Sequence, residues 1–129
     1  MASKAFISLA TSYDENYPPE NVLDKNEGSF WITTGIFPQI LVISLVQPTK
    51  IKKVRITSCD IKILRVETSS QTEVDNFVLE SEITLPHSDR QLQITELPIN
   101  NVRLHHLRLN IRSGYNHFVA VYKVLLSEE

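Results

Sequence analysis

The sequence of 129 residues has one cysteine, Cys59, and only three glycines. A single cysteine excludes an internal disulfide, and secreted β-domains of this size often carry one, so a reducing compartment is favoured. Three glycines are too few for a glycine-rich phosphate loop. Residues 1–15 lack the apolar run of a signal peptide, and the longest apolar run, Ile40–Val46, is too short to span a bilayer. We therefore expect a cytosolic protein.

A strong charge of either sign is also missing. The formal net charge is -2 and the pI is about 6.1, so nothing favours electrostatic capture by nucleic acid or by an anionic membrane. Hydrophobic residues make up 42% of the chain, which is typical of a globular protein. The length predicts one domain over residues 1–129, large enough for one substantial core.

No recognisable catalytic group is present. Cys59 has no nucleophile signature around it, and the carboxylates show no spacing that singles out an acid–base pair. Of the four histidines, His105 and His106 are adjacent on an expected strand, where successive side chains point to opposite faces and cannot chelate one ion together. We expect surface or strand-end histidines, a buried or semi-buried cysteine and no enzyme activity.

A period of two dominates the sequence, and a sustained helical period is missing. In Leu104–Arg112, for example, Leu107, Leu109 and Ile111 share one face, which is typical of a half-buried strand. Turn residues separate the segments. The pattern predicts an all-β fold, a two-sheet antiparallel β-sandwich of jelly-roll type. Its expected strands are Ala5–Leu9, Gln39–Val46, Lys53–Thr57, Ile61–Glu67, Phe77–Ile83, Gln91–Glu96, Leu104–Arg112 and Phe118–Leu126.

Residues 18–39 depart from this pattern because oxygen-bearing side chains crowd in front of Phe30 and Trp31, the only tryptophan. Pro19 to about Asp24 is the one helical candidate, with proline in the first turn. Calcium prefers such oxygens on a tight turn, but asparagine, aspartate, serine and glycine also favour ordinary turns. We expect a structural clasp anchored to the core by Phe30 and Trp31. The residues leave open whether a cation takes part.

The same stretch resembles a known fold family. Ala10-Thr11-Ser12, Pro19-Glu20-Asn21-Val22-Leu23-Asp24 and Ser29-Phe30-Trp31 are similar to the opening of discoidin-like, galactose-binding-like β-sandwich domains. In that superfamily the turn often holds a structural calcium ion. Pro18-Pro19-Glu20-Asn21, the run Phe30–Gln39 and the late His117-Phe118-Val119-Ala120 resemble the intraflagellar transport protein 25 (heat shock protein beta-11) family in particular.

This resemblance implies a non-enzymatic subunit of the intraflagellar transport B complex, in the cytoplasm and the cilium or flagellum. Members of the family pair with a Rab-like small GTPase, intraflagellar transport protein 27, as a heterodimer. Two alternatives belong to other classes. One is a discoidin-like carbohydrate- or lipid-binding module, although such domains are mostly extracellular and tied by disulfides. The other is a nuclear scaffold-type interaction domain, which shares the fold but not the run Phe30–Gln39.

The resemblance also implies a structural calcium site. Its ligands would be the main-chain carbonyls of Asn21 and Asn26, the carboxylate of Asp24 and the hydroxyl of Ser29, completed by groups near the C-terminus. Lys25 stands where a glycine is common. Ser127 lines up with a family glutamate, and Glu128 lies one step further along the chain.

Two expected strands are apolar on both faces, which predicts a covered outer surface. In Gln39–Val46, one face carries Leu41, Ile43 and Leu45 and the other carries Ile40, Val42 and Val46. In Phe118–Leu126, one face carries Phe118, Ala120, Tyr122, Val124 and Leu126 and the other carries Val119, Val121 and Leu125. Either a loop or terminal segment folds over the outer face, or the GTPase partner binds there. The parity that points outward stays open, and the candidate partner-binding residues are Val42, Val46, Val119 and Val121.

Overall fold

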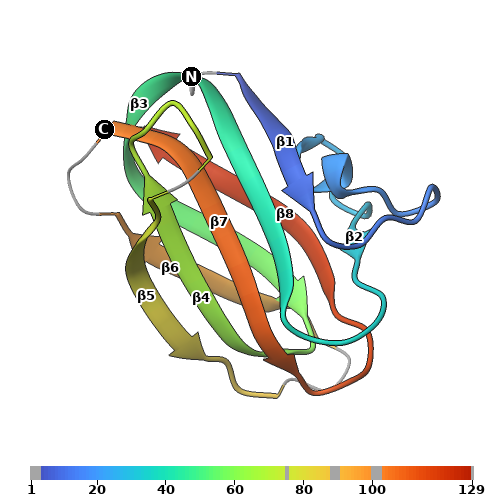
Figure 1. Ribbon diagram of the computed structural model, residues 1–129. Helices are drawn as coiled ribbons and strands as arrows, with labels where there is room; N and C mark the ends of the chain where they lie inside the picture. The colour runs from blue at the N-terminus through green and yellow to red at the C-terminus, as the bar shows by residue number, and fades with distance from the viewer. Residues whose placement is uncertain (1–3, 75, 88–90, 100–102, 129) are drawn as a thin grey trace.

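The computed structural model describes residues 4–74, 76–87, 91–99 and 103–128, which form two packed β-sheets (Figure 1). Every strand pair in them is antiparallel. Within these ranges no helix is long and apolar enough to cross a membrane. The elements are β1 (Ala5–Ala10), the short 3-10 helix η1 (Pro19–Leu23), β2 (Trp31–Ile32), β3 (Gln39–Cys59), β4 (Ile61–Ser69), β5 (Val78–Thr84), β6 (Gln93–Pro98), β7 (Arg103–Gly114) and β8 (Ala120–Glu128).

The long strand β3 belongs to both sheets. Its first part pairs with β1 and β7 in a sheet of order β1–β3–β7–β4–β5, which faces the viewer in Figure 1. Its second part pairs with β8 and β6 in the sheet β2–β8–β3–β6 behind. The pairing with β7 is irregular between Ser44 and Thr49, next to Pro48. Pro48 cannot donate to the ladder, and pairing with β7 resumes at Thr49 and Lys50 before Ile51 pairs with β8 in the other sheet.

The prediction of a two-sheet antiparallel β-sandwich is confirmed. The expected segments Gln39–Val46 and Lys53–Thr57 are parts of one strand, because the chain stays extended through Pro48. The strand β2 was missed, since its two residues are too few to show an alternation. The predicted helical turn forms as η1, and Pro19 occupies its first turn.

The hydrophobic core lies between the sheets. From β3 it receives Leu41, Ile43 and Leu45, the set predicted to share one face, and η1 adds the fully buried Val22. The other buried members are Trp31, Ile51, Val54, Ile56, Ile61, Leu64, Val66, Leu85, Ile99, Leu104, Leu107, Leu109, Ile111, Val119, Val121 and Val124.

The parity of β8 changes in the middle of the strand. Val121 faces the core, as does Val119 just before the strand, but so does Val124, three positions after Val121. The change follows a register shift at Tyr122, where two residues of β8 lie opposite one step of β3. A strict period of two had placed Val124 on the face opposite Val121, and that prediction is wrong because a bulge reverses the alternation.

Candidate functional site

A polar network holds the end of β1 to the start of β3. The side-chain amide oxygen of Gln39, Oε1, accepts hydrogen bonds from the hydroxyls of Thr11 at 2.7 Å and Ser12 at 2.5 Å. The side-chain nitrogen of Gln39, Nε2, donates to the main-chain carbonyls of Thr34 at 3.0 Å and Ile36 at 2.7 Å. Gln39 is 5% exposed, and these four bonds use both of its donors and both of its acceptor positions.

The two aromatic residues at the end of the loop act differently. Trp31 is fully buried in the core, and its indole N–H donates to the main-chain carbonyl of Ser12 at 3.0 Å. Phe30 stays outside the core cluster and lies between Tyr17 and Tyr122, with ring centroids at 4.7 and 4.9 Å. Trp31 therefore anchors the loop to the core as predicted, whereas Phe30 fixes it to the β8 strand through aromatic contacts.

The structure brings the four predicted metal ligands together in one loop, which we call the cradle: Asn21, Asp24, Asn26 and Ser29. The carboxylate of Asp24 accepts from the Ser29 hydroxyl at 2.7 and 2.9 Å and from the main-chain N–H of Asn26 at 3.0 Å. The amide of Ser29 donates to the Asn26 carbonyl at 3.1 Å. The Asn21 side chain donates to the carbonyl of Phe30 at 3.0 Å and closes the loop.

A lysine that the motif does not contain points into the cradle. The ammonium nitrogen of Lys123, from β8, lies 2.7 Å from the Asn21 carbonyl, 3.0 Å from the Ser29 carbonyl and 2.9 Å from the Ser29 hydroxyl. It also lies 3.0 Å from a carboxylate oxygen of Asp24. The side chain of Lys123 is only 11% exposed. Three N–H donors are thus surrounded by four oxygens.

The electrostatics of the cradle follow from these contacts. The Ser29 hydroxyl, and after it the Lys123 ammonium, hold the pKa of the Asp24 carboxyl below its ordinary value, because both favour the charged form. Ser29 has one hydroxyl proton, and it accepts from Lys123 while facing the carboxylate. The Ser29 hydroxyl therefore links the Lys123 ammonium to the Asp24 carboxylate through two hydrogen bonds, in addition to the direct ion pair.

The residues present do not fit calcium. Calcium takes six to eight oxygens and gains affinity from the number of charged ligands. The cradle contributes a single carboxylate, and the ammonium group of Lys123 already makes hydrogen bonds to its oxygens.

The C-terminal groups expected to complete the site lie elsewhere. Ser127 and Glu128 pair with Lys53 and Ile51, and Ser127 is four strand residues beyond Lys123, roughly 13 Å away along β8. Lys25 is exposed. The available signal for Lys123 was that it is the single charged residue in the otherwise largely apolar segment Phe118–Leu126.

The paired histidines differ from the expectation. The rings of His105 and His106 stack with centroids 4.6 Å apart and planes 7° apart, so the prediction that they point to opposite faces is wrong. The pairing of β3 with β7 is irregular at this point, and Leu104 and Leu107, three positions apart, both enter the core. The alternation is therefore interrupted between these leucines, at the two histidines.

His106 is buried, and the expectation of a surface position is wrong for it. Its Nε2 lies 2.9 Å from the carbonyl of Thr72, which only accepts, so Nε2 carries the proton. Nδ1 then accepts from the hydroxyl of Ser44 at 2.6 Å, which lies 2.7 Å from the Ser8 hydroxyl. Ser44 is fully buried, so this arrangement is a structural network under the loop that follows β4.

Cys59 is half-buried, and burial followed by the neighbouring Asp60 charge raises the pKa of its thiol. A raised pKa is the opposite of what a nucleophilic cysteine needs. In the ranges that the structure describes, no three histidine, cysteine, aspartate or glutamate side chains gather at one point.

The candidate partner-binding residues fall into two groups. Val119 and Val121 are 1% and 0% exposed and belong to the core, so their proposed contact with a partner is wrong; the β8 alternation points them inward. Val42 and Val46 share the outer face of β3. Val42 is covered by its neighbours at 1% exposure, whereas Val46 is 58% exposed.

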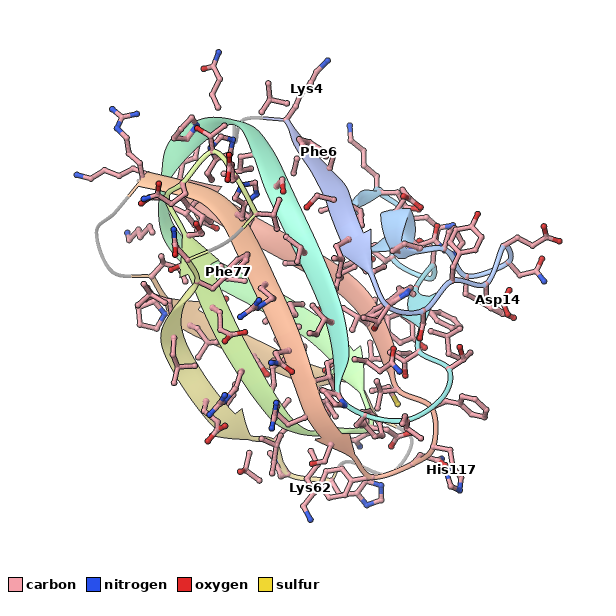
Figure 2. All side chains as sticks on the ribbon, in the orientation of Figure 1. Lys4, Phe6, Asp14, Lys62, Phe77 and His117 are labelled. Atoms are coloured by element: carbon pink, nitrogen blue, oxygen red, sulfur yellow. The ribbon has the colours of Figure 1, made fainter. Side chains whose placement is uncertain are left out.

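Part of the outer face of the front sheet is covered by the chain itself. The loop between β4 and β5 crosses β7 in Figure 1, and Phe77 from it lies over the Arg108 guanidinium at 4.1 Å. Arg108 in turn donates to both carboxylate oxygens of Glu67 at 2.8 and 3.1 Å. A covering loop therefore accounts for this side of the face (Figure 2 labels Phe77).

The β1 side of the same face keeps exposed apolar side chains. Phe6 pairs with Ser44 and Leu9 pairs with Val42, and Val46 follows on β3. Phe6, Leu9 and Val46 are exposed, and Figure 2 shows Phe6 on the front of the molecule. We call Phe6, Leu9, Val42 and Val46 the β1–β3 patch.

Solved structures share this fold at low sequence identity. The family 32 carbohydrate-binding module of NanJ from C. perfringens, in complex with galactose, has a TM-score of 0.79 and 16% identity, over 95% of this chain and 92% of that one. An F5/8 type C domain from Bacteroides fragilis has a TM-score of 0.72 and 12% identity, over 97% and 92%. The protein therefore has the discoidin-like, galactose-binding-like β-sandwich fold.

Relatives of higher identity define the family. The chain is 37% identical to the intraflagellar transport protein 25 homolog of Homo sapiens over 118 residues, 92% of this chain and 82% of the relative. It is 34% identical to intraflagellar transport protein 25 of Chlamydomonas reinhardtii, of whose longer chain it covers 62%. No family model matches the chain. The chain belongs to the intraflagellar transport protein 25 family, which confirms the resemblance and associates it with the cilium or flagellum.

Proposed function

We propose that this protein is a non-enzymatic subunit of the intraflagellar transport B complex, working in the cytoplasm and the cilium as a heterodimer with a Rab-like small GTPase of the intraflagellar transport protein 27 type. The identity of 37–38% to the human and mouse relatives over 92% of the chain carries the proposal. The raised pKa of Cys59 and the burial of His106 agree with a role without catalysis.

The β1–β3 patch is the surface that we assign to the GTPase. Its three exposed side chains are large and apolar, and they lie on adjacent, hydrogen-bonded strands of the front sheet. The loop between β4 and β5 covers the neighbouring part of the face but leaves these residues open. An apolar cluster of this kind fits the core of a permanent interface better than a transient polar contact.

Co-purification tests both statements. The protein is expressed with a Rab-like GTPase of the transport machinery, and the parent is expected to copurify in equal amounts. Phe6→Lys with Val46→Lys should fold, because both side chains are already exposed, but should lose the GTPase. Val78→Lys on β5 is the matched control, since Val78 is an exposed valine at the other edge of the same sheet.

The two results separate the two statements. A parent that never copurifies with the GTPase contradicts the function. A double variant that still copurifies leaves the function but moves the interface away from the patch.

A second candidate function, carbohydrate binding, is favoured by one observation. A hollow of about 440 Å³ lies between the β2–β3 and β7–β8 loops, and it is lined by Gly35, Ile36, Phe37, Gly114, Tyr115, Asn116 and His117. Solved structures with this fold bind galactose and chitotriose, but at 10–19% identity they show the fold alone. A glycan array with the parent protein decides this alternative: saturable binding that Tyr115→Ala abolishes would support it.

A further inference from the structure

The side chain of Lys123 fills the cradle between η1 and β2 and contacts the oxygens that a metal ion would need. We propose that the ammonium group of Lys123 takes the place of a divalent cation in the cradle, so that the loop is closed by an internal lysine and does not bind calcium. The clasp between the N-terminal loop and the last strand is then independent of metal.

The geometry around the nitrogen carries the proposal. The three N–H groups of Lys123 face two main-chain carbonyls, a hydroxyl and a carboxylate, all at 2.7–3.0 Å. Carbonyl, hydroxyl and carboxylate oxygens are also the ligands of a hard cation, which would sit 2.3–2.6 Å from them. An ion bound to the same oxygens would therefore overlap the position of the ammonium group and repel its charge.

The charge of the cradle leads to the same conclusion. Asp24 supplies one negative charge, the carbonyls of Asn21 and Ser29 supply none, and Lys123 supplies one positive charge. The cradle is thus neutral with the lysine in place. Calcium sites gain affinity from several carboxylates, and this cradle has no further carboxylate among the groups that surround the nitrogen.

Lys123 is held in this place by the fold. It lies within β8 and pairs with Thr57 of β3, so its backbone belongs to the interior of the rear sheet. Its side chain is 11% exposed, and a buried ammonium is costly unless oxygens surround it. The contacts to Asn21 and Ser29 span 102 and 94 positions of sequence, so one lysine ties the first loop to the last strand.

Thermal unfolding and calorimetric titration with calcium chloride test the proposal on the full chain. The melting temperature of the parent is expected to be the same with calcium and with a chelator, and the titration should show no binding heat. Lys123→Glu replaces the ammonium with a second carboxylate facing the same oxygens. This variant should melt lower than the parent in chelator and recover with calcium, because calcium at 100-fold its Kd raises the folded-to-unfolded ratio about 100-fold.

Two controls separate the cradle from general charge effects. Lys123→Gln removes the ammonium without adding a carboxylate, so it should be less stable than the parent and respond to calcium less than Lys123→Glu. Lys52→Glu makes the same charge change at an exposed lysine and should not respond to calcium. If Lys123→Glu does not fold, Lys123→Gln and the parent still decide between the alternatives.

Two outcomes overturn the proposal. One is a parent protein that binds calcium or gains stability from it. The other is a Lys123→Gln variant as stable as the parent, since the ammonium would then not close the clasp.

Discussion

Gln39 is the residue on which the network at the start of β3 depends, and replacing it with leucine isolates that network. Leucine has a similar size but no polar side-chain atoms, so the change removes the hydrogen bonds with little change of volume. The bonds lost are those from Thr11 and Ser12 and those to the carbonyls of Thr34 and Ile36. Gln39→Leu should destabilise the fold because Gln39 is buried.

The magnitude follows from what happens to each partner. A typical hydrogen bond contributes about 0.5–1.5 kcal/mol to stability. The lower value applies here because the partners find substitutes: Thr11 is exposed to water, and the Ser12 hydroxyl also lies 3.0 Å from the Thr34 carbonyl. Four bonds at about 0.5 kcal/mol each give a loss of about 2 kcal/mol.

Urea unfolding followed by the fluorescence of Trp31, the only tryptophan, measures this loss. With a slope of about 1–3 kcal/mol per molar urea, the midpoint should fall by roughly 1 M. Gln47→Leu is the control, since Gln47 is an exposed glutamine on the same strand. If Gln39→Leu and Gln47→Leu unfold at the same urea concentration, the reasoning about the network is refuted.

Three further predictions concern the core, a glycine and the cysteine. Leu109→Ala should lower the free energy of unfolding by about 2–5 kcal/mol in the same assay, because Leu109 is fully buried; a loss below about 1 kcal/mol would contradict its place in the core. Gly114→Ala should cost about 1–3 kcal/mol, since its Cβ would lie 2.7–3.0 Å from three neighbouring atoms, whereas Gly28→Ala should be nearly neutral in the same measurement. Cys59 should react with iodoacetamide at pH 8 more slowly in the native protein than in urea, because its raised pKa leaves less thiolate; equal rates would contradict this.

Most of the fold could be predicted because one face of most strands is buried. The alternation in Leu104–Arg112 put Leu107, Leu109 and Ile111 inward, and all three are core residues. Where the prediction failed, the pairing was irregular. The shift at Tyr122 and the irregularity opposite His105 each reverse the alternation, and a single sequence carries no mark of such a bulge.

The outer face shows a second limit. Apolar residues on both faces of Gln39–Val46 indicated a cover over the outer face, which holds for the buried Val42 but not for Val46, which is exposed. The sequence could not tell which segment supplies it. The covering loop between β4 and β5 is held by contacts of Thr72 and Phe77 with β7, about 30 residues apart in sequence, and no local pattern links them.

The cradle shows why a local motif alone does not decide which cation closes the loop. Asn21, Asp24 and Ser29 fold into the arrangement that their spacing implies, because the hydrogen bonds within η1 and the turn after it join residues that are close in sequence. The charge at the centre comes from Lys123, about 100 positions away, and it arrives through the pairing of β8 with β3. A neutral cradle and an anionic one differ by that single distant residue. The identity of the residue at position 123, rather than the loop motif, therefore decides whether a divalent cation or an ammonium group closes the clasp.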